Sequence, residues 1–530
     1  MPRVHPLLPL VFFGGFCLAA LSAAAQISPD PDPLARMRQA AAANTQTCSE
    51  SEISACAQAA PKIIASAMGA SPVAENLRRL TDGIGGRLTG SPAMERAVEW
   101  ALAAFRDVGI DDVHTEKFMI PHAWSEGATR VEIVSPSGFP LHAVSVAWSP
   151  ATPPNGIEAD VIDAGSGSAE DFGRAGGSAR GAILLVHTNV LRTFNDISSE
   201  SLRNPEIVRR SIAGGAGAIL WMGTREGMLL YRQRVGLGQD GSIEKLPQAI
   251  VARDDAQRMA RQLAAGQRIR IRLELPNRVG GPAEAQNVVA EIRGSERPND
   301  FVLLGAHLDS FDLGTGALDD GCNAALVIEA ARDIHLTGLR PKRSIRFVLF
   351  SGNEEGSLGS WAYVRAHRDE LDHADAAIIF DEGSGRVTGF SLQGRNDLQS
   401  EVLHQAVAPL DSWGVNRFTE NSNSIMGTDN LDFLLEGIPN LVANQEEANY
   451  VANYGASSDT YDKVDVPNLK FNTAVAGVLA FGLAEFAAPV GPRLSHAEIG
   501  SLLKRTDLES QLKALEIWPY WESGRRGRQP

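Results

Sequence analysis

Residues 301–307 read FVLLGAH, a short apolar run that ends in a histidine. Two similar runs follow, SIRFVLFSGNEE at 344–355 and AAIIFD at 376–381, and both end in acidic residues. Continuous apolar runs bounded by turn residues are typical of strands that are buried on both faces of a sheet. The segments between them, 323–336 and 360–370, can form helices. The alternation predicts a βαβαβ unit built on parallel strands.

The ends of the predicted strands carry acids and a histidine. Successive parallel strands end at one edge of a sheet, and open α/β sheets bind ligands at that edge. We therefore expect one site to gather residues that are distant in the sequence, namely His307, Glu354, Glu355 and Asp381. Asp319 belongs to a glycine-rich loop that could fold back over the same edge.

These residue types predict a metal site, because imidazole and carboxylate groups are ligands of divalent ions such as zinc. Asp319 could bridge two ions with its two oxygens. His307 and Asp381 would then complete the ligands of one ion, and Glu355 would bind the other ion together with one further ligand. A lone pair of adjacent glutamates is more often structural, but several acidic pieces at successive strand ends favour a metal-binding site.

Two further acids have predicted roles beside the metal. A divalent ion acidifies water, and Glu354 could take a proton for attack on a carbonyl group. Asp309 follows His307 by two residues and could fix the tautomer of the imidazole. The adjacent glutamates could therefore divide two tasks, because one can bind metal while its neighbour moves a proton.

Several motifs carry a resemblance to a known family. The longest are HLDSFDLGTGALDDG at 307–321 and RPKRSIRFVLFSGNEEGSLGS at 340–360. Shorter matching pieces are GRLTGSP at 86–92, QNVVAEIRG at 286–294, GTDNLDF at 427–433, GIPN at 437–440 and SSDTYDKVD at 457–465. The chain resembles the co-catalytic zinc exopeptidases of the aminopeptidase clan, in particular the carboxypeptidase Q-like group, over roughly residues 70 to 490.

The resemblance implies an α/β fold with a mixed, mostly parallel central sheet and helices on both faces, into which a protease-associated domain is inserted. It also implies two zinc ions. By resemblance, His307 and Asp381 bind one zinc, Asp319 bridges, and Glu355 binds the second. Glu354 corresponds to the general base, while Thr428 and Asp429 are expected to line the substrate pocket. The alternative role for Asp429 is to cap the helix predicted at 430–436.

One position departs from the family pattern. The second zinc of these enzymes normally takes a histidine from a motif like YHxSSDT, and Gly455 stands at that position here. Asn453, Tyr450 or Ser457 could stand in for the missing ligand, although neutral oxygens are poor replacements for imidazole on zinc. The second zinc site is therefore doubtful, and a degenerate peptidase that binds peptides without efficient turnover is the alternative function.

The chain divides into segments of different composition. Residues 7–20 are mostly apolar and small residues follow at 23–25, which is typical of a secretory signal and predicts an exported protein, periplasmic or secreted. The expected organisation is a signal peptide at 1–25, a loosely packed leader at 26–70, peptidase segments at 71–126 and 284–490, the protease-associated insertion at 127–283, and a C-terminal tail at 491–530.

Composition limits the partners. The net charge of −15 argues against non-specific binding to nucleic acid. No stretch after the signal is apolar for long enough to span a membrane. The expected substrate is a short peptide, and the resemblance suggests a homodimer.

The cysteines suggest a disulfide in an exported protein. Cys48 and Cys56 could form a bridge across a short loop, and two free thiols are the alternative. Cys322 follows the loop of Asp319, and we expect it to be a small packing residue.

Overall fold

The computed structural model of the protein describes residues 48–420 and 428–530. The predicted signal peptide and residues 26–47 of the predicted leader lie outside the described residues. No helix in the described ranges is long and apolar enough to cross a membrane.

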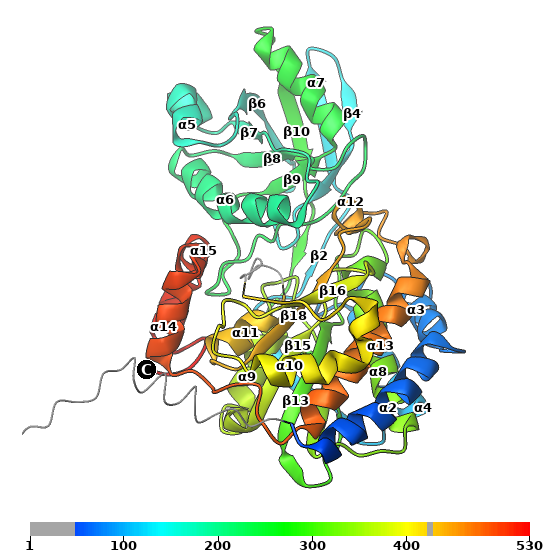
Figure 1. Ribbon diagram of the computed structural model, residues 1–530. Coiled ribbons are helices and arrows are strands. Elements are labelled where there is room, and N and C mark those ends of the chain that lie inside the picture. The colour runs from blue at the N-terminus through cyan, green and yellow to red at the C-terminus, as the bar shows by residue number, and fades with distance from the viewer. Residues whose placement is uncertain (1–47, 421–427) are drawn as a thin grey trace, which may run out of the picture. The chain divides into compact units, whose positions relative to one another are not determined.

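A mixed sheet of eight strands forms the centre of the fold (Figure 1). The predicted parallel unit lies in its middle, because β13 pairs in parallel with β14 and β15, and β15 in parallel with β18. Antiparallel strands flank this unit on both sides. In sheet order the strands are β1 (Val113–Ile120), β12 (Ala283–Ile292), β14 (Arg343–Phe350), β13 (Arg297–His307), β15 (Ala374–Ile379), β18 (Asn440–Gln445), β16 (Val387–Ser391) and β17 (Phe418–Thr419).

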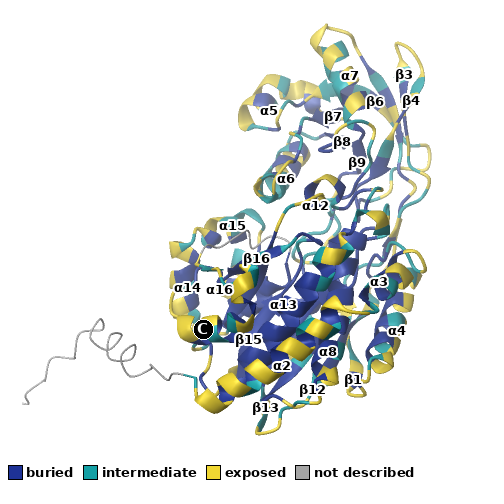
Figure 2. Ribbon diagram, turned by 45° about the vertical axis from the view of Figure 1, so that its right-hand side comes forward, coloured by how far each residue is buried: buried dark blue, intermediate teal, exposed yellow. Residues whose placement is uncertain are grey.

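Helices cover both faces of this sheet, as predicted. Side chains alternate between the faces of a strand, so Val302 and Leu304 belong to one core while Phe301 and Leu303 belong to another. The larger core contains α2 (Glu50–Met68), α3 (Val73–Thr81), α4 (Pro92–Asp107), α8 (Cys322–Leu336), α10 (Ser400–Val407) and α13 (Val466–Glu485). The smaller contains α9 (Leu358–Ala366) and α11 (Asn430–Leu435). Figure 2 shows that α13 is buried along most of its length.

The chain between β1 and β12 builds a second sheet of eight strands. Its order is β4 (Phe139–Leu141), β3 (Arg130–Ser135), β10 (Arg270–Glu274), β6 (Ile157–Asp163), β7 (Ile183–Val186), β8 (Ala218–Met222), β9 (Gln248–Val251) and β5 (Ala143–Ser145). Its helices are α5 (Ala169–Ala175), α6 (Phe194–Ala213) and α7 (Arg253–Ala264). A short ribbon of β2 (Trp124–Ser125) and β11 (Arg278–Val279) stands at the two ends of this segment. That the segment is a protease-associated domain stays a prediction.

The C-terminal tail is helical and packs on the body. It forms α14 (His496–Arg505), α15 (Leu508–Ala514) and α16 (Trp518–Glu522). Trp521 shares a hydrophobic cluster with Leu434 and Leu435 of α11. The tail therefore contributes to the same body as the central sheet.

The prediction of a loosely packed leader was wrong from residue 48 onward. Ser49 and Glu52 form a reciprocal capping box that begins α2. Ala59 and Ile63 on the inner side of the helix are fully buried in the larger core. The alanine-rich composition that suggested a loose segment instead allows α2 to pack closely against α8 and α13.

The predicted disulfide was also wrong, because Cys48 and Cys56 are both free thiols. Cys48 precedes α2, whereas Cys56 lies inside it on the buried face. The residues between the two cysteines form the first turns of a helix, which rises about 1.5 Å per residue, and not the short loop that the predicted bridge would need. Burial raises the pKa of Cys56 to about 12, which suits a packing residue. Cys322 is buried as expected.

A buried acid on α8 makes the stability of the fold depend on pH. Burial raises the pKa of Asp333 to about 7, and the negative charge of the neighbouring Glu329 raises it further. A hydrogen bond of 2.5 Å from Ser66 acts in the opposite direction and lowers the pKa. The folded protein then holds a proton that the unfolded chain releases near pH 4. The contribution of Asp333 to stability is therefore greatest below about pH 4 and is lost as the pH rises toward 7.

We expect Asp333→Asn to stabilise the protein more at pH 8 than at pH 5, by a difference of roughly 1–3 kcal/mol, because the amide does not ionise. Urea unfolding at the two pH values measures this difference. The exposed Asp369→Asn is the control and should show no such difference. An equal effect of D333N at both pH values would contradict the assignment.

Candidate active site

The strands of the central sheet end at the same level and so bring the predicted residues together. His307 is the last residue of β13 and lies opposite Phe350, the last residue of β14. Glu354 and Glu355 follow in the turn after β14, and Asp381 follows β15 by two residues. The expectation that one edge of the sheet gathers these side chains is met by this register.

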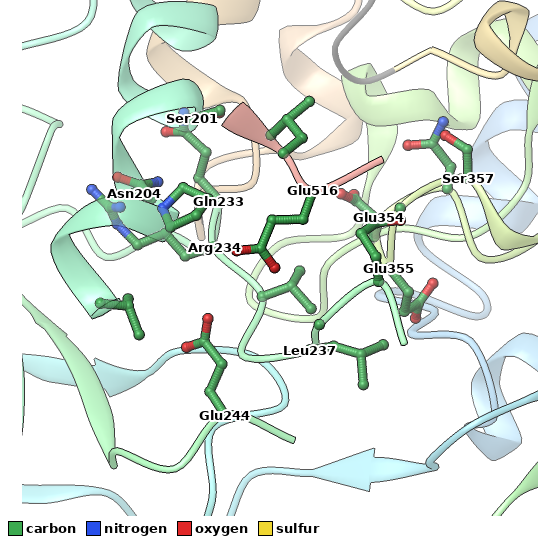
Figure 3. A pocket seen from close by; sticks show the side chains of 18 of the residues that line it. Ser201, Asn204, Gln233, Arg234, Leu237, Glu244, Glu354, Glu355, Ser357 and Glu516 are labelled. Atoms are coloured by element: carbon green, nitrogen blue, oxygen red, sulfur yellow. The ribbon is translucent and has the colours of Figure 1, made fainter. Parts of the chain in front are cut away.

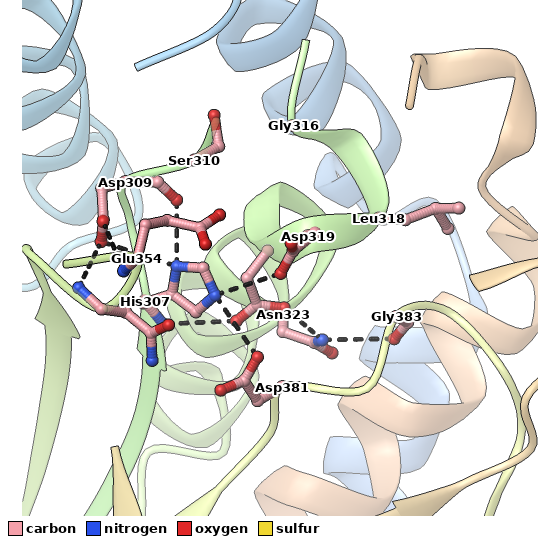
Figure 4. Close-up of polar contacts among 12 residues, drawn as sticks. His307, Asp309, Ser310, Gly316, Leu318, Asp319, Asn323, Glu354, Asp381 and Gly383 are labelled. Carbon is pink, nitrogen blue, oxygen red and sulfur yellow. Dashed lines mark hydrogen bonds and ion pairs between the residues drawn. The ribbon is translucent and has the colours of Figure 1, made fainter. Parts of the chain in front are cut away.

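His307, Asp319 and Asp381 form a compact buried group (Figure 4). Nε2 of His307 lies 3.3 Å from Oδ1 of Asp319 and 3.3 Å from Oδ1 of Asp381. One ligand atom from each residue lies within 4.8 Å of the other two. All three side chains are almost completely excluded from solvent.

The chemistry of this group fits a divalent cation. His307 Nε2, Asp319 Oδ2 and Asp381 Oδ2 are buried and have no hydrogen-bond partner among the described residues. Burial raises the pKa of Asp381 well above its ordinary range, and Asp319 opposite adds to this. Two negatively charged carboxylates that face each other away from water are unfavourable unless a cation neutralises them. One imidazole and two carboxylates are a suitable ligand set for zinc.

Asp309 connects His307 to the turn that carries Glu354 and Glu355, called the glutamate turn below. Nδ1 of His307 lies 3.0 Å from the backbone oxygen of Asp309, whereas the Asp309 carboxylate is 3.6 Å away. That carboxylate instead accepts hydrogen bonds of 3.2 Å from the backbone N–H groups of Asn353 and Glu354. Burial opposes the charge, yet the adjacent His307 lowers the pKa of Asp309. The backbone oxygen thus orients the imidazole, and the side chain holds the neighbouring turn.

The loop that carries Asp319 is held by two buried residues. The carboxylate of Asp459 accepts hydrogen bonds from three consecutive backbone N–H groups, those of Ala317, Leu318 and Asp319, at 2.7–3.2 Å. Arg87 is fully buried and donates to the backbone oxygens of three further residues, Leu308, Thr315 and Gly316. Asp459 therefore braces the loop of Asp319. Sequence reasoning missed Arg87, because a lone arginine in GRLTGSP gives no sign of what it will contact.

Asp459→Ala would leave three buried N–H groups without acceptors. We expect it to lower the free energy of unfolding by about 2–4 kcal/mol and to weaken zinc binding, since each such group costs roughly 1–3 kcal/mol. Urea unfolding and zinc titration measure the two effects. Asp462→Ala on the exposed side of the same segment is the control. Unchanged zinc affinity in D459A would refute the bracing role.

The two adjacent glutamates line the same cavity but differ in burial and in hydrogen bonding. Glu354 is half-buried, faces a cavity, and accepts a hydrogen bond of 3.2 Å from the backbone N–H of Phe311. Burial raises the pKa of Glu354 well above its ordinary range, and the nearby Asp319 adds to this. Glu355 is buried, and neither of its oxygens has a hydrogen-bond partner among the described residues. It is not part of the three-residue group around His307.

Of the three side chains considered as substitutes for the missing histidine, Tyr450 reaches the group. Its hydroxyl donates a hydrogen bond of 3.1 Å to Oδ1 of Asp319. The amide of Asn453 is engaged elsewhere, because it donates to the backbone of Asn449 and accepts from Ser458. Ser457 is exposed. Tyr450 belongs to the short helix α12 (Tyr450–Asn453).

Gly455 is a point of close backbone approach and could not simply be replaced by the family histidine. Its φ is +61°, and a Cβ atom there would lie 1.9 Å from the backbone oxygen of Arg232. Its own backbone oxygen accepts a hydrogen bond of 2.8 Å from the Arg232 N–H. A histidine at this position would clash with backbone before its ring could reach a metal ion.

We expect Gly455→Ala to destabilise the protein by about 2–3 kcal/mol, because the alanine is strained and meets Arg232. Gly227→Ala is the matched control, since Gly227 has a φ of +68° and nothing within 4 Å of its Cβ position. Thermal unfolding of both variants separates the clash from the strain of left-handed backbone. Equal losses in the two variants would show that the close approach is unimportant.

Thr428 and Asp429 do not line the cavity beside Glu354. Asp429 is buried, and its Oδ2 accepts a hydrogen bond of 3.1 Å from the side chain of Asn353, which does line it. Burial raises the pKa of Asp429 to about 6. Its side chain makes no capping hydrogen bond to α11, so the alternative role as a helix cap was wrong.

The cavity beside Glu354 has a volume of about 260 Å³ (Figure 3). Its walls come from three regions: the glutamate turn, the second sheet with its loops, and the C-terminal tail. Residues from the last two include Trp221, Gln233, Arg234, Glu244 and Glu516. Sequence reasoning did not find them, because nothing in the sequence places a loop of the second sheet or the tail next to Glu354.

Comparison with known proteins agrees with this geometry. Residues 287–480 match the model of peptidase family M28. The chain contains an M28 peptidase domain. It is 28% identical to carboxypeptidase Q of Rattus norvegicus over 412 residues, which cover 78% of this chain and 85% of the relative. Human carboxypeptidase Q is 27% identical over 413 residues, with the same coverage of both chains.

Solved structures extend the likeness. The peptidase M28 precursor of Shewanella amazonensis SB2B is 28% identical, with a TM-score of 0.74, and the match covers 84% of this chain and 99% of that one. A zinc aminopeptidase of Bacillus subtilis is 20% identical, with a TM-score of 0.60 over 77% of this chain and 93% of that one, and shares the fold. With the family match, the relatives support a metallo-exopeptidase.

Proposed function

We propose that the protein is an exported zinc exopeptidase that hydrolyses the terminal peptide bonds of short peptides or dipeptides. The observation that carries the proposal is the buried group of His307, Asp319 and Asp381, whose unpartnered ligand atoms face one another next to a cavity lined by Glu354. Export rests on the signal-like residues 1–25. Apart from the leader at 26–70, the proposed domain limits are those expected from the sequence.

His307, Asp319 and Asp381 would hold the zinc ion. When bound, zinc polarises the carbonyl group and acidifies water. Glu354 is suited to take the proton from the attacking water and to pass it to the leaving amine, because it faces the cavity and its raised pKa favours a carboxyl group that can both accept and release a proton. Asp309 keeps the turn of Glu354 fixed relative to His307.

The cavity supports a small substrate. A volume of about 260 Å³ is at the lower end of the range of about 300–1,000 Å³ that is usual for ligand pockets. Its mixed lining offers Trp221 for apolar contact and Gln233 and Glu244 for hydrogen bonding. Short peptides or dipeptides therefore fit better than a folded polypeptide. The homodimer suggested by the family resemblance remains part of this proposal.

The second candidate is a degenerate peptidase that binds peptides without turnover. Gly455 favours it, because this position cannot supply the family's metal ligand. Glu354 argues against it, since a binding protein has no need for a base that faces the cavity beside a metal site. Hydrolysis of a dipeptide panel by the zinc-loaded protein separates the two, and peptides blocked at either terminus distinguish aminopeptidase from carboxypeptidase activity. Binding without hydrolysis would favour the degenerate peptidase.

We expect Glu354→Gln to lower kcat by at least about 10²-fold while the zinc content stays unchanged, because the amide cannot accept the proton. Metal analysis and dipeptide hydrolysis are measured on the same preparation. Glu291→Gln is the control, since Glu291 lies on β12 and pairs with Arg346 away from the cavity. Retained activity in E354Q would exclude Glu354 as the base.

A further inference from the structure

Arg225 is a buried cation that the proposed mechanism does not use. It lies in the loop that follows β8, and only 2% of its surface is exposed. Its guanidinium donates to the backbone oxygen of Tyr454 at 2.7 Å and to the hydroxyl of Thr224 at 2.8 Å. Its Nε is buried without a partner, and among the described residues no carboxylate forms an ion pair with it.

An arginine that is buried without an adjacent counter-ion is unfavourable unless negative charge acts on it from nearby. The guanidinium lies over the ring of Tyr231 at 4.6 Å and near that of Tyr454 at 6.0 Å. Tyr454 packs on Tyr450 at 5.4 Å between ring centroids, and the Tyr450 hydroxyl donates to Asp319. Burial lowers the pKa of Arg225, while these tyrosines and the carboxylate of Asp319 oppose the shift.

Gly455 is what allows Arg225 to lie there. The segment of Leu230 to Arg232 runs beside residues 455–457 and joins them by backbone hydrogen bonds of 2.8 and 3.0 Å. Tyr231 and Ala456 form an antiparallel bridge between the two segments. Because the backbone oxygen of Arg232 would overlap a Cβ atom at residue 455, only glycine permits this contact. The space that a ligand side chain would cross is therefore filled by the loop of Arg225.

The residues present do not fit a second zinc ion. Position 455 offers no donor, and Oδ1 of Asp319 already accepts the hydroxyl of Tyr450. Of the ligands expected for the second ion, only Glu355 remains as a further carboxylate. We propose that the guanidinium of Arg225 supplies the positive charge that a second zinc ion provides in the family, so that this chain holds a single ion at His307, Asp319 and Asp381. The inference rests on the proposed zinc site.

The charge of Arg225 is permanent, since a guanidinium stays protonated in proteins. Like charges repel more strongly in a buried region than in water, so this cation opposes a second divalent ion beside Asp319. At the same time it offsets part of the acidic charge of the site without needing a ligand at residue 455. Arg225 is thus a positioning and charge-balancing residue, not a catalytic one.

Zinc stoichiometry tests the proposal. The apo-protein is titrated with zinc, and the bound metal per chain is measured by elemental analysis after removal of free ion. We expect one tightly bound zinc in the unaltered chain. Arg225→Gln should bind a second zinc about tenfold or more tightly than the unaltered chain does, because a repelling charge is gone. Arg225→Lys keeps the positive charge and should still bind one zinc ion per chain.

Arg253→Gln is the matched control. Arg253 is a partly buried arginine at the start of α7 that also donates to backbone oxygens, those of Thr188 and Gly223. The Arg253→Gln variant should still bind one zinc ion per chain. A purely structural role of Arg225 would lower the stability of R225Q without adding a zinc ion. Should R225Q fail to fold, two tightly bound ions in the unaltered chain would still overturn the proposal.

Two tightly bound ions in the unaltered chain, or a folded R225Q that gains none, would overturn the proposal. Dipeptide hydrolysis on the same samples keeps this result apart from the proposed function. Two ions with turnover would refute the role of Arg225 and leave the exopeptidase intact. One ion in the unaltered chain and a second in R225Q, with no turnover in either, would support Arg225 and refute the exopeptidase.

Discussion

The burial of two aspartates and a histidine at one sheet edge is the constraint on which the rest of the structure depends. His307, Asp319 and Asp381 point their ligand atoms at one another in a space closed to water, where like charges are unfavourable unless a cation joins them. The parallel register fixes His307 and Asp381, because they stand at or just beyond aligned strand ends. Asp319 comes from a loop and needs separate support.

That support comes from charged side chains that form hydrogen bonds with the backbone. Asp459 accepts three successive N–H groups of the Asp319 loop, and Arg87 donates to three backbone oxygens around it. Asp309 does the same for the glutamate turn. Such contacts satisfy backbone groups that would otherwise be buried without partners. They hold irregular segments in one geometry, so that Glu354 and the metal-binding group keep their spacing.

The second sheet takes part in the site rather than standing apart from it. Its loop reaches Gly455 through backbone hydrogen bonds and brings Arg225 beside Tyr454, which packs on the Tyr450 that donates to Asp319. It also supplies Trp221, Gln233 and Glu244 to the cavity next to Glu354. The peptidase domain carries the group of His307, Asp319 and Asp381 that we propose to bind zinc, whereas the inserted segment shapes the space where a substrate would bind.

The sequence by itself determined the parallel strands and the residues at their ends. Apolar runs bounded by turns are a local signal, and the runs that begin at Phe301, Ser344 and Ala376 lie in the strands β13, β14 and β15. Local composition misled where packing decided the outcome: α2 is helical and buried although its alanine-rich sequence suggested a loose leader. Only the tertiary structure decided that Gly455 is a point of close backbone approach and what Arg87 and Arg225 contact. Those facts depend on backbone approach between segments more than 200 residues apart, which leaves no periodic trace in the sequence.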